Sequence, residues 1–196
     1  MKLNFGCGRD YKNGWINIDN NIDFKADKYV DVFKFPLPFK DGSVGEIYAS
    51  HVIEHCPRHV GLTKLFEELY RICREGAVIT IKVPHVSDFG AFADSTHHYY
   101  FKSDTLNYIF TTSFTGEKPV SRFEFVSSKI TVALYHWRFL NVLNPFVNRF
   151  KWFSEKFLGK YIPFEEITWV LRVKKGEPLR SSPKINDDHA GVCNVA

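Results

Sequence analysis

Short runs of apolar and β-branched residues alternate along the chain with one clear helical pattern. The run AVITIKV is almost wholly apolar and β-branched, which is typical of a central parallel strand covered on both faces. In ITWVLRV the apolar residues recur at every second position, which is typical of a half-buried antiparallel strand. The strands predicted from such runs are Lys2–Phe5, Trp15–Asp19, Glu46–Ala49, Ala77–Val83, Phe123–Leu134 and Ile167–Val173, with a further short strand at Tyr29–Val32.

Helical periodicity is clearest over Val60–Arg74. Leu62, Leu65 and Leu69 recur there at spacings of three and four residues, and Gly76 supplies a stop signal. Strands that alternate with helices, followed by two alternating strands, predict an α/β domain. We expect a Rossmann-like, mainly parallel sheet with an antiparallel C-terminal edge hairpin.

Length and composition limit the possible classes of protein. A chain of 196 residues predicts one domain, over 1–176, and the polar segment 177–196 is expected to remain a flexible tail. The net charge of +4 is too small to indicate nucleic-acid binding by itself. The chain lacks a membrane-length apolar run and an export signal, and its cysteines form no CxxC pair, so a cytoplasmic location with reduced thiols is predicted. The cysteines are Cys7, Cys56, Cys73 and Cys193.

A glycine turn, Gly6-Cys7-Gly8, directly follows the first predicted strand, and Asp19 ends the second one. A dinucleotide-binding loop would have a third glycine where Tyr11 stands, and its acidic residue would come about 20 residues on, after a full helix. The short connection favours a ligand that has a ribose but no phosphate, because it leaves no room for a long helix at a pyrophosphate. S-adenosylmethionine fits this pattern better than NAD. A tight turn without function is the alternative.

Two further strand ends are expected beside this turn. Asp31 lies at the end of one predicted strand and Ser50-His51 at the end of another. The carboxyl ends of parallel strands meet at one edge of the sheet, where ligands bind. Asp31 would accept a hydrogen bond from an adenine amino group, with Val32 against the ring.

Five segments carry a resemblance to a known family: LNFGCG, GWINID, DVFKFPLPFKDGSVGEIYASHVIEH, ELYRICREGAVITIKVPH and AFADSTHHYYF. Together they cover most of residues 2–110. The sequence resembles class I S-adenosylmethionine-dependent methyltransferases, and within them the small type 11 group. The resemblance implies a seven-stranded sheet that binds S-adenosyl-L-methionine across its carboxyl ends and transfers a methyl group.

The resemblance also implies roles for individual residues. Gly6, Cys7 and Gly8 would line the methionine end of the cofactor, and Ser50 and His51 would border it. Asp19, with Asn20 beside it, would hold the ribose, while Asp31 and Val32 would frame the adenine. Asn4 stands where many relatives carry an acidic residue, and Arg9 is a possible substitute partner for the amino-acid end of the cofactor.

The histidines offer a base or a metal site. His51, His55 and His59 follow at four-residue steps, but Pro57 interrupts the spacing and no HExxH motif is present, so no metal site is predicted. The long loop that contains His97 is either an aromatic cover or part of the active site. We expect His97, or secondarily His51 or His85, to orient or deprotonate the acceptor.

A stripe of phenylalanines near the C-terminus has helical spacing: Phe146, Phe150, Phe153 and Phe157, with basic residues around it. The first expectation is a helix that packs this stripe on the core. The alternatives are a substrate lid, a contact in a homodimer, or a basic helix on a membrane surface.

Taken together, the sequence predicts a cytoplasmic methyltransferase that acts on a small molecule, for example a sugar or glycan precursor. A non-catalytic S-adenosylmethionine-binding protein is the first alternative, and an NAD-dependent enzyme is the second. Modification of nucleic acid is disfavoured because the chain has no strong basic stripe.

Overall fold

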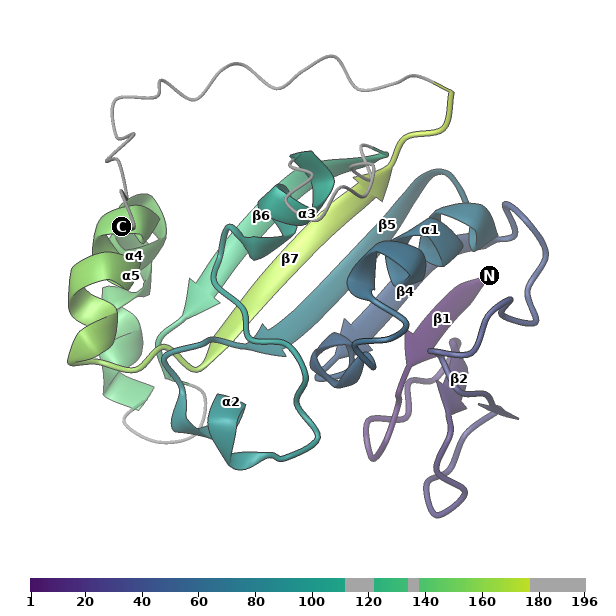
Figure 1. Cartoon of the computed structure of the whole chain (residues 1–196), viewed down its shortest axis with the longest axis horizontal. Helices are drawn as coiled ribbons and strands as arrows, with labels where there is room; N and C mark the ends of the chain where they lie inside the picture. Colours follow the sequence, from purple (N-terminus) through teal and green to yellow (C-terminus); the bar gives the residue numbers. More distant parts are fainter. Residues whose placement is uncertain (112–121, 134–137, 177–196) are drawn as a thin grey trace, which may run out of the picture.

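Seven strands form one sheet in the order β3-β2-β1-β4-β5-β7-β6 (Figure 1). The computed structural model describes residues 1–111, 122–133 and 138–176. β1 to β5 run parallel, and β7 runs antiparallel to both β5 and β6. The strands are β1 Lys2–Phe5, β2 Ile16–Asp19, β3 Lys28–Tyr29, β4 Val44–Ser50, β5 Cys73–Pro84, β6 Phe123–Thr131 and β7 Glu166–Val173. The predicted fold class, a mainly parallel sheet with an antiparallel hairpin at one edge, is confirmed.

The helices are α1 Leu62–Ile72, α2 Phe89–Ala93, α3 Thr105–Thr111, α4 Asn144–Arg149 and α5 Lys151–Phe157, with 3₁₀ turns η1 Ile53–His55, η2 Arg138–Leu143 and η3 Leu158–Lys160. The short strand expected at Tyr29–Val32 is shifted, since β3 ends at Tyr29 and the following residues form a loop. Leu134 and the predicted tail 177–196 lie outside the described residues. No described helix combines the length and the apolar character that crossing a bilayer requires.

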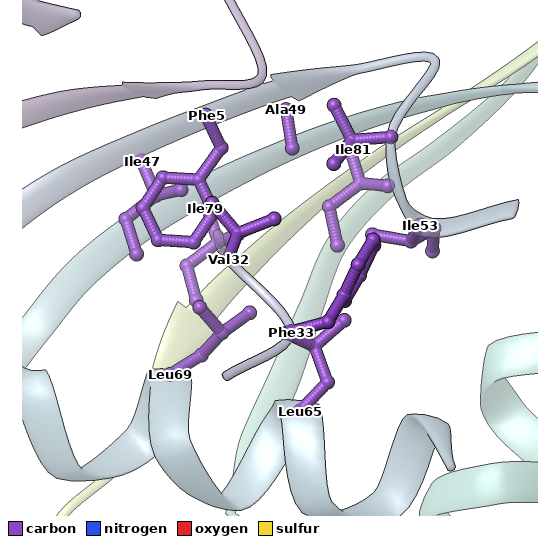
Figure 2. Close-up of a pocket in the computed structure, with 11 residues that line it drawn as sticks. Phe5, Val32, Phe33, Ile47, Ala49, Ile53, Leu65, Leu69, Ile79 and Ile81 are labelled. Atoms are coloured by element: carbon purple, nitrogen blue, oxygen red, sulfur yellow. The ribbon is translucent and has the colours of Figure 1, made fainter. Parts of the chain in front are cut away.

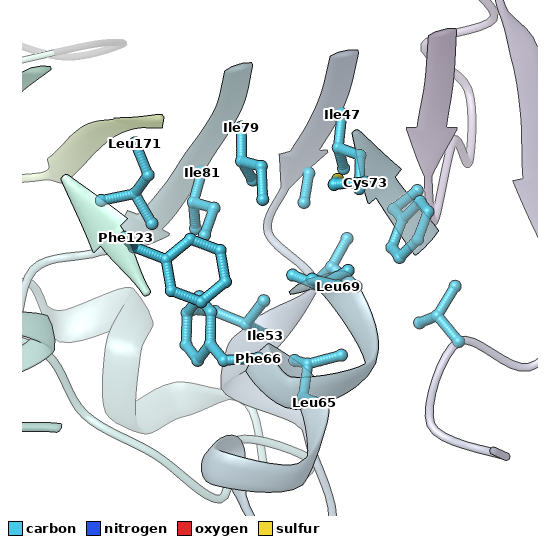
Figure 3. Packing of buried hydrophobic residues seen from close by; sticks show 14 of the residues in the cluster. Ile47, Ile53, Leu65, Phe66, Leu69, Cys73, Ile79, Ile81, Phe123 and Leu171 are labelled. Atoms are coloured by element: carbon cyan, nitrogen blue, oxygen red, sulfur yellow. The ribbon is translucent and has the colours of Figure 1, made fainter. Parts of the chain in front are cut away.

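The main core lies between the sheet and α1. Figure 3 shows Leu65, Phe66 and Leu69 of α1 facing the isoleucines of β4 and β5. Phe66 also packs edge-on against Phe110 of α3, with ring centroids 4.9 Å apart. Figure 2 shows the same apolar layer, where the side chains leave a void of only about 10 Å³. A space of that size with wholly apolar walls is ordinary close packing and not a ligand site.

The opposite face of the sheet differs from the prediction. In β5, Ile79 and Ile81 are fully buried under α1, whereas Val78, Thr80 and Lys82 keep partial exposure. The expectation of a strand covered on both faces is therefore wrong. The physical reason is visible in the strand itself, because threonine and lysine occupy alternate positions and tolerate a half-solvated face.

A pair of buried asparagines holds the connection between β1 and β2, which contains no helix. The Asn17 side-chain oxygen accepts hydrogen bonds from the Lys12 N–H (2.8 Å) and from the Asn4 amide (2.9 Å). The same Asn4 amide donates to the Asp10 carbonyl at 2.7 Å. These bonds satisfy backbone groups that a helix would otherwise satisfy internally, so a very short connection still has a defined shape.

The phenylalanine stripe occupies two short helices and not one. α4 and α5 meet at Phe150, whose backbone (φ −124°, ψ 52°) is not helical. All four phenylalanines of the stripe are exposed, each by at least 44%, so the expectation that they pack on the core is wrong. The side of α4 that faces the sheet instead carries Asn144 and Asn148, whose amides bond the backbone of Val132 and Ile130.

Candidate functional site

A cleft of about 770 Å³ opens at the carboxyl ends of β1, β2, β3 and β4. Its volume is within the usual range for a small-molecule site. Its lining contains seven residues that were predicted to bind the cofactor: Gly6, Gly8, Asp19, Asn20, Asp31, Val32 and His51. It also contains residues that the sequence did not single out for this site: Asn21, Phe24, Val30, Phe33, Val52, His55, Asp94 and Thr96.

The glycine turn after β1 has a backbone that only glycine adopts easily. Gly6 and Gly8 have φ values of 55° and 47°, in the left-handed region. A Cβ on Gly6 would also lie 2.7 Å from Cγ2 of Val52, at another wall of the cleft. Both positions therefore need glycine if the turn is to keep its shape beside the cleft.

Asp19 fixes this turn and faces the cleft. Its Oδ2 accepts the Gly8 N–H at 2.7 Å, and its Oδ1 accepts the Asn21 N–H at 2.9 Å. Although the residue is only 7% exposed, it contributes to the lining. Each carboxylate oxygen has a further lone-pair site, so Asp19 can accept two hydroxyl groups while it holds the backbone.

The wall next to Asp19 is largely apolar. Phe24, Val30, Val32 and Phe33 contribute to it, and Asp31 supplies a carboxylate whose Oδ1 accepts the Phe33 N–H at 3.0 Å. A flat apolar ring with an exocyclic amino group matches such a wall, because the carboxylate can accept from the amino group.

Three residues predicted at the cofactor are not part of the lining. Asn4 is 2% exposed and is engaged in the β1–β2 connection described above. Cys7 is buried; its N–H donates to the Ile18 carbonyl, and burial, followed by the nearby Asp19 charge, raises the pKa of its thiol. Ser50 is the last residue of β4 and pairs with Lys82 in the sheet.

His51 is held between two carboxylates in a strained backbone. Its φ is 56°, which is uncommon for a residue other than glycine. Nε2 lies 3.3 Å from Glu166 Oε2, and Nδ1 lies 3.5 Å from Glu54 Oε1. Hydrogen bonding to Glu166 and then to Glu54 raises the pKa of His51 to about 9. The imidazole is therefore a cation at neutral pH and is not placed to remove a proton, because both ring nitrogens face carboxylates.

His55 is a cleft residue that the sequence did not identify as one. Thr96 Oγ1 donates to Asp94 Oδ1 at 2.6 Å, so the same hydroxyl accepts the proton of His55 Nδ1, 2.9 Å away. This arrangement leaves the lone pair of the neutral ring on Nε2. The sequence feature that could have identified His55 is its position five residues after the end of β4, because the ends of the parallel strands converge there.

His97 lies behind His55 and does not itself line the cleft. Its Nδ1 donates to the Ala91 carbonyl at 2.8 Å, and its ring packs edge-on against His55 with centroids 4.7 Å apart. Glu54, which is fully buried, brings a carboxylate to the same place. Ligand atoms of Glu54, His55 and His97 lie within 4.8 Å of one another, so the three side chains have the donor types of a metal site. This set differs from the histidine triple considered from the sequence.

His85 lies away from the cleft. It is 1% exposed, its Nδ1 accepts the Ser87 N–H at 3.0 Å, and its Nε2 lies 3.0 Å from Glu155 Oε1. Glu155 belongs to α5, so His85 connects the end of β5 with the C-terminal helices. Both ring nitrogens are thus engaged within the protein.

Known structures share this arrangement of strands and helices. The chain is similar to a SAM-dependent methyltransferase from Archaeoglobus fulgidus, with 18% identity over 87% of this chain and 85% of that one and a TM-score of 0.56. A methyltransferase from Mesorhizobium loti gives 12% identity, coverage of 88% and 90%, and a TM-score of 0.54.

The fold is that of class I S-adenosylmethionine-dependent methyltransferases. At the level of the fold, this confirms the resemblance seen in the sequence. The [4+2]-cyclase SpnF is also similar, with 12% identity, coverage of 89% of this chain and 75% of that one, and a TM-score of 0.56. No family model matches the chain, and no curated protein matches it in sequence.

Proposed function

We propose that the protein is an S-adenosylmethionine-dependent methyltransferase with a small-molecule acceptor. The observation that carries the proposal is the convergence, in one cleft, of the Gly6–Gly8 turn, the Asp19 carboxylate and the apolar wall with Asp31. These features match a nucleoside without phosphates. In this proposal Asp19 holds the ribose hydroxyls, with Asn20 beside it, while Asp31 and Val32 face the adenine.

The amino-acid end of such a cofactor carries a carboxylate. His51 lines the cleft, but its two ring nitrogens already face Glu54 and Glu166, so it borders this end of the cofactor without a free N–H to donate. Arg9, exposed next to the glycine turn, is the candidate partner of opposite charge for this carboxylate. The bound cofactor would supply a methyl group on a sulfonium that is already a good leaving group, so the protein has to orient the acceptor and exclude water.

An acceptor hydroxyl also benefits from a base. We assign this role to His55, because its Nε2 keeps the lone pair and its side chain lines the cleft. His97, the residue favoured from the sequence, packs on the His55 ring and orients it. A sugar or glycan precursor remains the proposed acceptor class. A cytoplasmic location is part of the same proposal.

The first test is calorimetry with S-adenosylmethionine, its demethylated product and NAD. We expect binding of the first two and none of NAD; the reverse would refute the assignment. Mass spectrometry of products from a panel of sugar acceptors then tests transfer. The cyclase SpnF has a similar fold, so the fold by itself does not decide that a methyl group is transferred. Binding without any methylated product would favour the non-catalytic alternative.

The second test separates the histidines. His55→Ala should lower turnover about 10²- to 10⁴-fold, the usual contribution of a general base, with little change in cofactor affinity. His97→Ala should have a smaller effect of the same kind. His59→Ala, an exposed residue outside the lining, is the matched control and should leave turnover unchanged. Equal losses in affinity and turnover would show that His55 has a structural role.

A further inference from the structure

The C-terminal helices expose an unusual amount of aromatic surface. Between residues 138 and 161 the large apolar side chains that are at least 44% exposed are Phe139, Val142, Phe146, Phe150, Trp152, Phe153, Phe157 and Tyr161. We refer to these eight residues as the aromatic surface. Phe146 contacts Phe150, and Phe157 contacts both Trp152 and Phe153 through their rings. Clusters of exposed apolar side chains usually mark an interaction site.

The segment that carries the aromatic surface is held to the rest of the protein by specific contacts, so the exposure of the rings does not come from poor packing. Asn148 both accepts from the Ile130 N–H (2.8 Å) and donates to the Ile130 carbonyl (2.7 Å), and Asn144 accepts from the Val132 N–H (2.9 Å). Val147 and Phe164 form a small separate core beneath the helices. The inner side is thus satisfied by amides and by this core, and the rings are left on the outside.

Exposed positive charge surrounds the rings. Arg138, Arg149, Lys156 and Lys160 are all exposed, whereas Glu155, the only acidic residue in the described stretch 138–164, is turned inward to His85. The Lys156 ammonium lies 4.5 Å from the centre of the Trp152 ring, and the Arg149 guanidinium lies 5.6 Å from that of Phe150. Apolar and cationic groups are therefore interleaved on one unit.

We propose that this unit, η2 to η3, docks on the surface of an anionic phospholipid bilayer. Rings enter the boundary between headgroups and acyl chains, where tryptophan and tyrosine are favoured, and the surrounding cations meet lipid phosphates. The positive charge around the rings favours an anionic bilayer over a second copy of the chain. Two copies meeting through the aromatic surface would bring four exposed cations of each together without any exposed acidic partner in that stretch.

The position of the unit is compatible with a working enzyme on a membrane. α4 contacts β6, at one edge of the sheet, whereas the cleft lies at the ends of β1 to β4 toward the other edge (Figure 1). The docking unit and the cleft are therefore separated along the width of the sheet. The proposal does not depend on methyl transfer, and either can fail without the other.

The test is co-sedimentation of the full chain with vesicles of phosphatidylglycerol and phosphatidylcholine, compared with phosphatidylcholine alone. We expect binding only to the anionic vesicles, with strong weakening between about 0.1 M and 0.5 M salt because of screening. Lys156→Glu/Lys160→Glu should lower partitioning at least about tenfold. Lys40→Glu/Lys64→Glu makes the same change in net charge at exposed positions elsewhere and should bind like the wild type.

A second measurement locates the contact. Brominated lipids in the same vesicles should quench Trp152, and Trp152→Phe should remove most of that quenching while thermal unfolding and cofactor affinity stay unchanged. Three results would overturn the proposal: no binding to anionic vesicles, equal loss in both charge variants, or a dimer in light scattering whose contact shields Trp152.

Discussion

Replacing Asp19 by asparagine tests the geometry of the cleft most directly. In the wild type the two carboxylate oxygens accept the Gly8 and Asn21 N–H groups at 2.7 and 2.9 Å. The amide of the Asp19→Asn variant would keep one acceptor oxygen and place an NH₂ group against the other N–H. One hydrogen bond is lost at a site only 7% exposed, and the unpaired group costs about 1–3 kcal/mol of unfolding free energy.

The effect on the ligand is separate from the effect on stability. A charged acceptor that holds a ribose hydroxyl contributes about 1.5–3 kcal/mol, so Asp19→Asn should raise the dissociation constant of S-adenosylhomocysteine by about 10- to 150-fold. Calorimetry measures the affinity, and urea unfolding measures the stability of the same sample.

Asp23→Asn is the matched control for this variant. Asp23 is an exposed acid in the same loop, outside the lining of the cleft, so its replacement removes the same charge at a neighbouring place. We expect it to bind as the wild type does. If Asp19→Asn were folded and bound the nucleoside within a factor of about two of the wild type, Asp19 would not hold the ribose.

Two further predictions concern the turn and the charged histidine. Gly6→Ala should destabilise the protein by about 2–4 kcal/mol in urea unfolding, because it adds a clash with Val52 to a left-handed backbone strain of about 1–2 kcal/mol. Gly14→Ala is the control, since Gly14 also has a positive φ but faces open space, so only the strain should appear. Equal losses of unfolding free energy in the two variants would contradict the clash. His51 has a folded pKa of about 9, above its unfolded value, so its stabilising contribution is complete below about pH 6.5 and is lost as pH rises through 9. Because the side chain is 44% exposed, we expect this contribution to the free energy of unfolding to be only about 1 kcal/mol. His51→Asn should remove the decline in stability between about pH 7 and 9.5. If the wild type and the variant lost stability with the same slope, the titration would belong to another group.

The sequence was sufficient for the parts of the site that depend on local spacing. A glycine turn after one strand and a carboxylate at the end of the next are brought together by any parallel sheet, so Gly8 and Asp19 were predictable. The place of His55 was not predictable, because its contact with Thr96 depends on the return of the loop 85–101, whose His98 and Tyr99 N–H groups bond the Glu54 carbonyl. That contact joins residues more than forty positions apart and leaves no periodic signal.

The phenylalanine stripe shows a different limit. Its spacing predicted helical structure correctly, but periodicity alone does not tell whether a stripe faces inward or outward. The deciding signal was polar: Asn141, Asn144 and Asn148 recur at spacings of three and four and form the side that meets the sheet. A stripe of amides opposite a stripe of rings reverses the usual orientation of an amphipathic helix.

The asparagine contacts to β6 have a consequence for how the protein behaves at high concentration. An edge strand with free amide and carbonyl groups recruits further strands and promotes aggregation. At one end of this sheet β3 is only two residues long, which leaves little to recruit. At the other end, the side chains of Asn148 and Asn144 bond the backbone of Ile130 and Val132 at the C-terminal end of β6. They cover that end of the edge strand without offering a new strand.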